Sequence, residues 1–237
     1  MMFSRSFKRL KCYLLGETNQ NMIPFLTILL AIILLNLLLF HEKKENRKPA
    51  FITKSILSLL FVVAAVIQPH PLPNYYSYLF IGLIFCLIGD VCLALPEKFF
   101  KAGLVAFLLG HVFYLISFTT LTSMVQWLSL GALLFFMISA IVFFWLRPHL
   151  GAMLGPVFVY ILVITVMASA AWAVFRETAL PAPGRSLILL GAIAFYVSDV
   201  FVARNKFIKN EFLNRLVGLP LYYLGQFLLA FSPGSLG

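Results

Sequence analysis

Eight long apolar segments dominate this chain, and they restrict it to a helical membrane architecture. A helix needs roughly 20 apolar residues to cross a bilayer, and charged or turn-forming stretches separate the segments. The composition agrees, because 62% of the 237 residues are apolar and 11% are charged, whereas soluble domains are about 45–50% apolar and about 25% charged. We therefore predict an all-α integral membrane bundle of eight transmembrane helices. They are placed at residues 22–40, 51–68, 75–95, 100–120, 125–146, 151–175, 184–203 and 212–231.

The first apolar segment decides how the N-terminus is interpreted. Residues 1–21 are basic, and the run at 22–40 has no small-residue cleavage site after it. The apolar core of a signal peptide is about 7–15 residues long, so this longer run predicts a retained helix. We expect a basic N-terminal segment at 1–21, a transmembrane domain at 22–231 and a short tail at 232–237.

The net charge of +10 and the three cysteines indicate which binding partners and bound groups to expect. Lysines and arginines sit mostly between the apolar runs, which favours anionic lipid headgroups over nucleic acid. Cys12, Cys86 and Cys92 are odd in number and form no CxxC motif. We therefore predict no disulfide framework, no metal site and no cofactor, and the oligomeric state stays open.

The basic residues also give a topology, because positively charged loops favour the cytoplasmic side. The loops after the odd-numbered segments hold ten basic residues against six on the other side. We predict that the odd loops are cytoplasmic and that both termini are outside, although the basic N-terminus opposes this. The ten are Lys43, Lys44, Arg47, Lys48, Lys98, Lys101, Arg147, Arg204, Lys206 and Lys209, and the six are Arg5, Lys8, Arg9, Lys11, Arg176 and Arg185.

Two stretches resemble each other at an offset of 109 residues: GLIFCLIGDVCLALPEKF from Gly82 and GAIAFYVSDVFVARNKF from Gly191. Two four-helix halves in parallel orientation are the simplest architecture that explains the match. A chance match is the alternative. The paired positions are Gly82 with Gly191, Asp90 with Asp199, Val91 with Val200, Ala94 with Ala203, and Tyr114 with Tyr223.

Asp90 and Asp199 are the only aspartates in the chain, and both lie inside apolar segments. A carboxylate near the bilayer centre costs at least about 2.5–3.5 kcal/mol, so such residues usually have a function. Each lies about five residues before its segment ends, or roughly 7–8 Å of helix. We expect the two carboxyl groups at similar depth on the predicted cytoplasmic side. The structural alternative is that each one locks helices together.

Other polar residues lie on neighbouring segments and could complete a pocket. Lys54 lies near the start of its segment, where it could hold one aspartate ionised or simply extend to the membrane surface. His111 and Tyr114 share a helix face because they are three residues apart. We place Lys54 and the aspartates near the mouth of the pocket and His111, Tyr114 and Gln226 on its wall or floor. For the histidine, core packing is the alternative.

The remaining candidates are predicted to support or bind the substrate. For the tyrosines, packing with one hydrogen bond is the default alternative, and for the two loop residues it is a solvated basic loop. Such a pocket suits an amphiphile whose polar head stays at the interface. These candidates are Tyr160, Tyr196, Asn205, Lys206 and Tyr223.

The runs FIGLIFCLIGDVCLAL, GHVFYLISF, GAIAFYVSDVFVARNKF and LYYLGQFLLA resemble the YhhN-like lysoplasmalogenase family of membrane proteins. The resemblance covers most of the chain beyond the first segment, and it extends to Asp90, His111, Tyr114, Asp199, Asn205, Lys206, Tyr223 and Gln226. Lys54 maps onto a lysine of the family pattern, although Ser55 follows it where the family commonly has proline.

The resemblance implies hydrolysis of the vinyl ether bond of lysoplasmalogens to a fatty aldehyde and a glycerophospho-headgroup. A vinyl ether is cleaved by protonation of its β-carbon, which leaves an oxocarbenium ion for water to attack. Two carboxyl groups with separated pKa values can supply the acid and the base, as in glycoside hydrolysis. We expect Asp90 and Asp199 in these catalytic roles, without assigning which is the acid.

Several other functions stay open. A proton-coupled transporter of a small amphiphile would use the same aspartates, although no proline or glycine pair breaks either helix near them. An intramembrane aspartyl protease is disfavoured because Leu87 occupies the first position of the GxGD pattern and Ser198 precedes Asp199. A non-catalytic lipid-binding protein is a further alternative. A serine hydrolase lacks its GxSxG motif.

Overall fold

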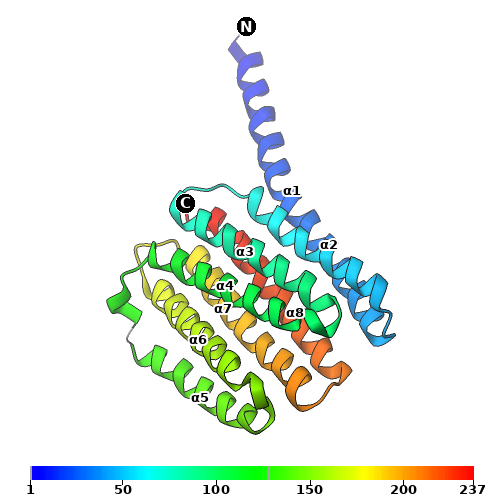
Figure 1. Cartoon of the computed structure of the whole chain (residues 1–237). Helices are drawn as coiled ribbons and strands as arrows, with labels where there is room; N and C mark the ends of the chain where they lie inside the picture. Colours follow the sequence, from blue (N-terminus) through cyan, green and yellow to red (C-terminus); the bar gives the residue numbers. More distant parts are fainter. Residues whose placement is uncertain (1, 128) are drawn as a thin grey trace.

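The computed structural model describes the backbone of residues 2–127 and 129–237, and the side chains from Met22 onward except those of residues 125 and 128. Within these residues the chain is all-helical, without a strand (Figure 1). The α-helices are α1 (Met2–Lys43), α2 (Arg47–Val66), α3 (Pro73–Ala94), α4 (Phe100–Thr119), α5 (Leu130–Leu150), α6 (Leu154–Arg176), α7 (Ala182–Ala203) and α8 (Phe212–Phe231). Short 3-10 helices lie at Glu97–Phe99, Met124–Trp127, Gly151–Met153 and Pro233–Ser235, and a π-helix at Arg204–Ile208.

The two aspartate-bearing helices, α3 and α7, lie in the middle of the bundle (Figure 1). Helix α3 packs mainly on α4, and α7 packs mainly on α8. Helices α1 and α2 form one side of the bundle, and α5 and α6 form the other. Contacts of α8 with α2 and of α4 with α6 join these groups, so residues from distant parts of the sequence meet between α3 and α7.

Glycines let both central helix pairs approach closely. A Cβ atom on Gly82 of α3 would lie 3.1 Å from the carbonyl oxygen of Gly110 on α4, and one on Gly225 of α8 would lie 2.8 Å from that of Gly191 on α7. Such small-residue contacts are typical of helix pairs in membranes. Gly155, which has the spacing of a small-residue packing motif with Gly151, instead has open space around its Cβ position.

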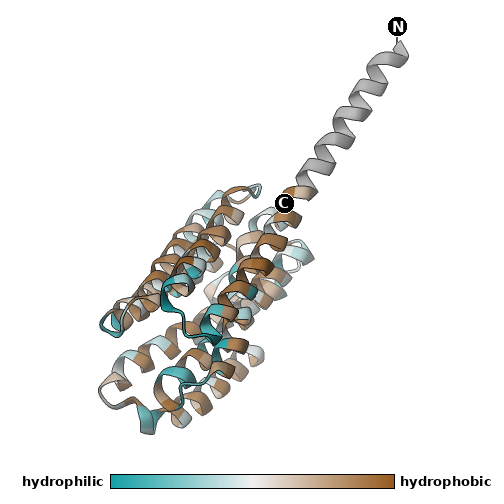
Figure 2. Ribbon diagram, turned by 90° about the vertical axis from the view of Figure 1, so that its right-hand side faces the viewer, coloured by the Kyte–Doolittle hydropathy of each residue, from teal (hydrophilic) through white to brown (hydrophobic). Residues whose placement is uncertain are grey.

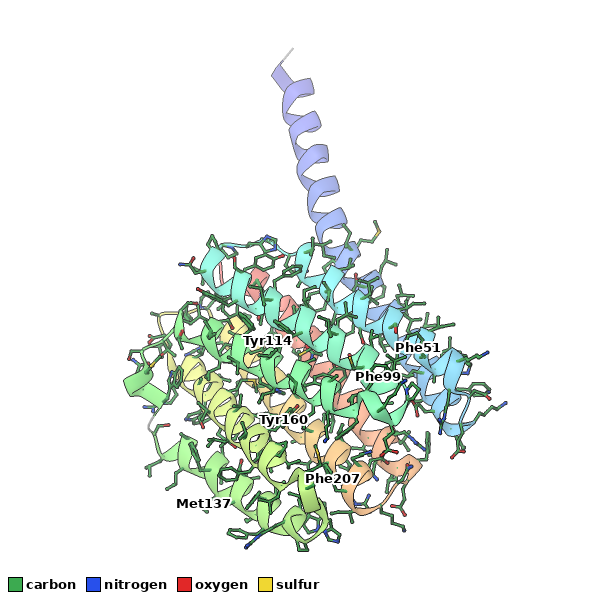
Figure 3. The ribbon with its side chains drawn as sticks, viewed as in Figure 1. Phe51, Phe99, Tyr114, Met137, Tyr160 and Phe207 are labelled. Atoms are coloured by element: carbon green, nitrogen blue, oxygen red, sulfur yellow. The ribbon has the colours of Figure 1, made fainter. Side chains whose placement is uncertain are left out.

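The outer surface of the bundle is apolar, as expected of a protein that faces lipid. Large side chains such as Phe25, Ile141 and Phe144 are each more than 60% exposed, a surface that a soluble monomer rarely presents. In Figure 2 the helices are largely brown, and teal residues gather toward their ends and in the connections. Figure 3 shows Met137 on the outer helix α5, whereas Tyr114 and Tyr160 lie within the bundle.

In the described part of the chain, six segments are long and apolar enough to cross a membrane. The fifth of them, Leu130–Arg176, contains both α5 and α6. Helix α8 is not among the six, because its polar residues lower its hydropathy; most of these face inward, Asn214, Tyr222, Tyr223 and Gln226 being buried. The predicted count of eight spans therefore goes beyond what length and hydropathy establish.

Most predicted boundaries agree with the helices to within a few residues, and the exceptions are the start of the first segment and both ends of the fifth. That segment was predicted at 125–146, ending before Arg147, whereas α5 runs from Leu130 to Leu150 and includes Pro148. Leu146 and Leu150 are buried against Val157 of α6, which holds this last turn in place. The helix ends at Gly151, whose positive φ of 48° suits glycine.

The ends of the predicted domain also differ from expectation. Helix α1 begins at Met2, so the predicted basic segment and the first apolar run form one helix. The tail continues from α8 into a 3-10 helix, and Leu236 is buried against Gly184 at the start of α7. The predicted parallel repeat is not established by this arrangement, and it stays a prediction.

Candidate active site

A cavity of about 600 Å³ lies between the central helices and contains both aspartates in its wall. Its inner lining is mostly apolar, with Leu104, Phe107 and Ile164 among the contributors. Its polar residues gather at the end of the bundle where α1, α3 and α7 finish and where α2 and α8 begin. The two acidic residues predicted from sequence therefore share one cavity.

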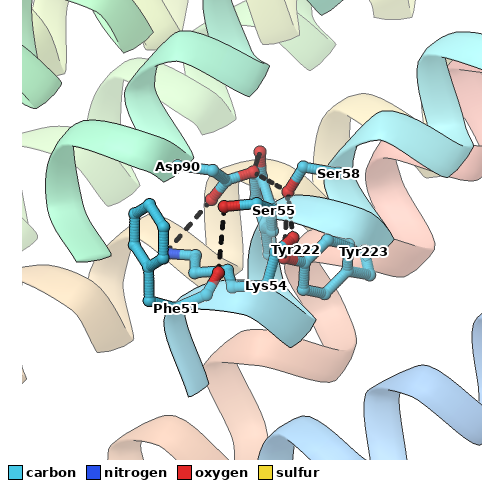
Figure 4. A network of polar contacts seen from close by, with 7 residues as sticks. All are labelled: Phe51, Lys54, Ser55, Ser58, Asp90, Tyr222 and Tyr223. Carbon is cyan, nitrogen blue, oxygen red and sulfur yellow. Dashed lines mark hydrogen bonds and ion pairs between the residues drawn. The ribbon is translucent and has the colours of Figure 1, made fainter. Parts of the chain in front are cut away.

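Asp90 is fully enclosed by groups that donate hydrogen bonds (Figure 4). The ammonium nitrogen of Lys54 on α2 lies 3.1 Å from Oδ1. Ser58, one turn further along α2, donates to Oδ2 at 2.7 Å, and Tyr222 of α8 donates to the same oxygen at 2.5 Å. The side chain of Asp90 is only 1% exposed. Of the two partners considered for Lys54, the structure selects Asp90.

Asp199 has a different set of neighbours. The hydroxyl group of Tyr160 on α6 donates to Oδ2 at 2.7 Å. The Nε2 atom of His111 on α4 lies 3.7 Å from the same oxygen. The Asp199 side chain is 17% exposed, so it is more open to the cavity than that of Asp90.

His111 is buried and its ring is fixed from both sides. Nδ1 lies 2.8 Å from the carbonyl oxygen of Phe107, one turn earlier in α4. Phe195 and Tyr160 pack against the ring with centroids 4.5 and 5.2 Å away. Nε2 has no hydrogen-bond partner among the described residues. The imidazole therefore presents one unsatisfied nitrogen toward Asp199.

Ion pairs surround the mouth of the cavity. Lys206 of the π-helix lies 2.5 Å from Glu97 in the α3–α4 connection and sits above the Phe100 ring. Arg215 of α8 lies 3.5 Å from Glu42 at the end of α1. All four charged residues line the cavity. The mouth thus carries positive and negative side chains next to each other.

The loop between α7 and α8 is held by its own polar contacts. The Asn205 side-chain oxygen accepts from the Glu211 backbone N–H at 3.2 Å and from Asn214 Nδ2 at 3.3 Å. The Lys209 ammonium group beside Glu211, together with Arg204, lowers the pKa of that carboxyl. Asn205 lines the cavity, so this loop positions the residues at its mouth.

Four of the predicted pocket residues are absent from the cavity lining. Tyr114 donates to the Gln226 side-chain oxygen at 2.6 Å, and both residues are fully buried. Tyr223 lies 3.1 Å from Ser58 Oγ and thus contacts a partner of Asp90. The prediction placed His111, Tyr114 and Gln226 on the wall or floor of the pocket, but none of the three lines the cavity. Tyr223 does not line it either.

The other predicted residues line the cavity, whereas two residues that contact Asp90 were not predicted. Tyr160 and Tyr196 face it, as do Lys54, Asn205 and Lys206. The hydroxyl of Tyr196, however, bonds Ser139 of α5 rather than Asp199. Sequence reasoning missed Ser58 and Tyr222 as partners of Asp90. The spacing of Ser58, four residues after Lys54, was the available signal for the first.

Comparison with known proteins adds to this geometry. The model of the YhhN family matches residues 48–233. That range covers more than half of the sequence and contains both aspartates with their contacts. The chain belongs to the YhhN family. No solved structure matches it.

Curated relatives of known name align with about two thirds of the chain. Lysoplasmalogenase TMEM86A of Bos taurus is 31% identical over 163 residues, which is 65% of this chain and 64% of the relative. The Homo sapiens protein of the same name is 32% identical over 158 residues, with the same coverage. Lysoplasmalogenase TMEM86B of Rattus norvegicus is 32% identical over 160 residues, which is 66% of this chain and 62% of the relative. The alignments thus span slightly less than two thirds of these relatives.

The family and the apolar helices together establish the cellular setting at a coarse level. The described helices carry several segments able to cross a bilayer, and residues 48–233 match the YhhN family. The chain is an integral, multi-pass membrane protein. The charged cavity mouth then lies at one face of the membrane.

Proposed function

We propose that this protein is a membrane hydrolase that cleaves the vinyl ether bond of lysoplasmalogens. The observation that carries the proposal is the pair of carboxyl groups, Asp90 and Asp199, in one largely apolar cavity with a charged mouth. The names of the curated relatives, which are lysoplasmalogenases, support the substrate class. The products would be a fatty aldehyde and a glycerophospho-headgroup.

The shape of the cavity suits an amphiphile with one chain. Its volume of about 600 Å³ lies within the range of about 300–1,000 Å³ that is usual for small-molecule sites. The alkenyl chain would lie along Leu104, Phe107 and Ile164. The phosphate group would bind at the mouth, near Lys206 and Arg215. In this arrangement the vinyl ether, which joins chain and headgroup, would lie beside the aspartates.

Two carboxyl groups are sufficient for the chemistry. A protonated carboxyl gives its proton to the β-carbon of the vinyl ether, which leaves an oxocarbenium ion. A carboxylate stabilises that cation and accepts a proton from the water molecule that attacks it. The resulting hemiacetal collapses to the aldehyde and the free glycerol hydroxyl. Overall, one water molecule is consumed and no redox change occurs.

We also propose that α8 crosses the membrane as an eighth span, with its polar residues turned toward the bundle. Its packing along α7 supports this. With eight spans both termini lie on one side, and the cavity mouth lies on the other. The larger number of basic residues in the loops at the mouth favours the cytoplasmic side for it.

The direct test uses purified protein in detergent with lysoplasmenylethanolamine as substrate. We expect release of a fatty aldehyde and of glycerophosphoethanolamine in equal amounts. The matched control is the saturated 1-alkyl ether analogue, which has no double bond to protonate and should not be cleaved. Absence of aldehyde from folded protein would overturn the proposal, and proton-coupled uptake into liposomes would then identify the transporter.

A further inference from the structure

We infer that the two aspartates hold opposite protonation states in the resting protein, with the proton on Asp199 and the charge on Asp90. We infer further that His111 is a positioning residue that keeps the Asp199 proton in place. The catalytic consequence rests on the proposed function. The protonation states themselves follow from the donors and acceptors around each carboxyl group.

The hydrogen-bond pattern of His111 fixes where its ring can carry a proton. Its Nδ1 faces the Phe107 carbonyl oxygen at 2.8 Å, and a carbonyl oxygen can only accept. Nδ1 therefore carries a hydrogen atom, and in the neutral ring Nε2 is an acceptor. Nε2 is buried without a hydrogen-bond partner among the described residues and lies 3.7 Å from Asp199 Oδ2. A buried acceptor is stabilised by a hydrogen-bond donor, and the group that faces Nε2 is the Asp199 carboxyl.

A protonated Asp199 supplies that donor. Its hydroxyl can point toward Nε2, which at 3.7 Å lies just beyond hydrogen-bond distance, while the same oxygen accepts from Tyr160 at 2.7 Å. If Asp199 were ionised and His111 neutral, two acceptors would face each other inside the bundle. The remaining alternative is a carboxylate beside a doubly protonated imidazole. That ion pair would require burying two charges, which is costly in a low-dielectric interior.

Asp90, in contrast to Asp199, is surrounded by hydrogen-bond donors. The Lys54 ammonium at 3.1 Å has only hydrogen atoms to offer, and Ser58 and Tyr222 both donate to Oδ2. Tyr223, the next hydroxyl in the network, contacts Ser58 Oγ and the Lys54 carbonyl oxygen rather than the carboxyl group. One ammonium group and two hydroxyl groups around the same carboxyl match an ionised carboxylate. The single hydroxyl hydrogen of Ser58 also lies toward the Lys54 carbonyl oxygen, 2.9 Å from Oγ, so the assignment of the charge to Asp90 rests mainly on Lys54 and Tyr222.

These states assign the steps of the proposed reaction. Asp199, the more exposed of the two, gives its proton to the β-carbon and becomes a carboxylate. Asp90 stabilises the oxocarbenium ion and takes a proton from the attacking water. In the collapse of the hemiacetal, Asp90 returns that proton to the departing glycerol oxygen, and Asp199 accepts the hemiacetal hydroxyl proton. Both carboxyl groups then regain their starting states.

The chain offers a test that needs no substitution, because it contains only two aspartates. Protein labelled with ¹³C at the aspartate side-chain carboxyl carbon would be examined by infrared spectroscopy at neutral pH without substrate. The isotope shift should reveal one protonated carboxyl group and one carboxylate. Two carboxylates, or two protonated groups, would overturn the inference. This readout is independent of turnover, so its failure is distinguishable from failure of the proposed function.

Substitutions then assign the two signals. Asp199→Asn should remove the labelled signal of the protonated group, and Asp90→Asn should remove that of the carboxylate. The opposite assignment would contradict the inference. Thermal unfolding in the same detergent establishes whether each variant is folded. If one of them is unfolded, the wild-type spectrum alone tests the inference.

The role of His111 has its own readout. His111→Phe keeps an aromatic ring but removes the acceptor, so the C=O stretch of the protonated Asp199 should move to higher wavenumber. His111→Gln offers an acceptor again and should move it back toward the wild-type position. The pH profile of aldehyde release should shift in His111→Phe and be partly restored in His111→Gln. An unchanged C=O stretch and profile in His111→Phe would show that the ring has a packing role only.

Discussion

The two central carboxyl groups differ in how each is compensated for its burial. Asp90 has a cation and two hydroxyl donors, whereas Asp199 has one hydroxyl donor and a neutral ring nitrogen. Burying a charge is costly unless it is paired and hydrogen-bonded. The asymmetry at the level of single atoms is therefore what allows two identical side chains to take different roles.

Lys54 provides a prediction at this scale. Lys54→Met leaves the Asp90 carboxylate without its cation, and losing one partner of a buried ion pair costs about 3–5 kcal/mol. We expect a lower midpoint of thermal unfolding and a loss of aldehyde release of about 10²-fold or more. Lys54→Arg keeps the charge and should retain more of both. Equal activity in wild type and Lys54→Met would show that the ion pair is unnecessary.

At the scale of helices, close packing sets the positions of the aspartates. A methyl group on Gly225 would lie 2.8 Å from the Gly191 carbonyl oxygen and 3.0 Å from the Phe195 backbone nitrogen. Backbone atoms cannot move aside as a flexible side chain can. The spacing of α7 and α8 therefore determines how Asp199 and Tyr222 are placed around the cavity.

Gly225→Ala tests this packing. We expect it to destabilise the protein by about 1–3 kcal/mol, measured by thermal unfolding in detergent, and to reduce aldehyde release. Gly155→Ala is the matched control, since its new methyl group would meet open space and alanine is the better helix former by about 1 kcal/mol. Similar behaviour of both variants would argue against close α7–α8 packing.

The connections at the cavity mouth give a second prediction at this scale. Lys206→Gln removes a positive charge from the proposed phosphate site, so KM for lysoplasmenylethanolamine should rise several-fold while kcat changes little. Its partner Glu97 is 84% exposed, and such surface pairs contribute about 0–1 kcal/mol to stability. The unfolding midpoint should thus stay near that of wild type. An unchanged KM would remove Lys206 from headgroup binding.

The sequence anticipated more of the elements than of the contacts between them. Hydropathy located the helices because bilayer thickness fixes their length. The cost of burying charge singled out Asp90, Asp199 and Lys54. The sequence could not show that His111 faces Asp199 or that Tyr222 reaches Asp90, because these contacts depend on helix rotation and on the packing of distant helices. For the same reason Tyr114 and Gln226, on the expected helices, pair with each other behind the cavity.

At the scale of the whole molecule, the orientation in the membrane decides from which side the substrate headgroup arrives. Single cysteines at Lys98, near the cavity mouth, and at Glu177, at the opposite end of the bundle, would report it in a cysteine-free background. A membrane-impermeant maleimide should label position 177 in intact cells and position 98 only after permeabilisation. The reverse pattern would place the cavity mouth outside the cell.

The whole account depends on both aspartates acting in one hydrolytic site. Aldehyde release from lysoplasmenylethanolamine by Asp90→Asn and by Asp199→Asn measures this most directly. Tyr75→Phe serves as the control for folding, because it removes a buried hydrogen bond to Ser232 far from the cavity. We predict that each Asn variant stays folded and loses at least about 10²-fold in kcat, while Tyr75→Phe keeps its rate. Near wild-type release by either Asn variant would contradict the account.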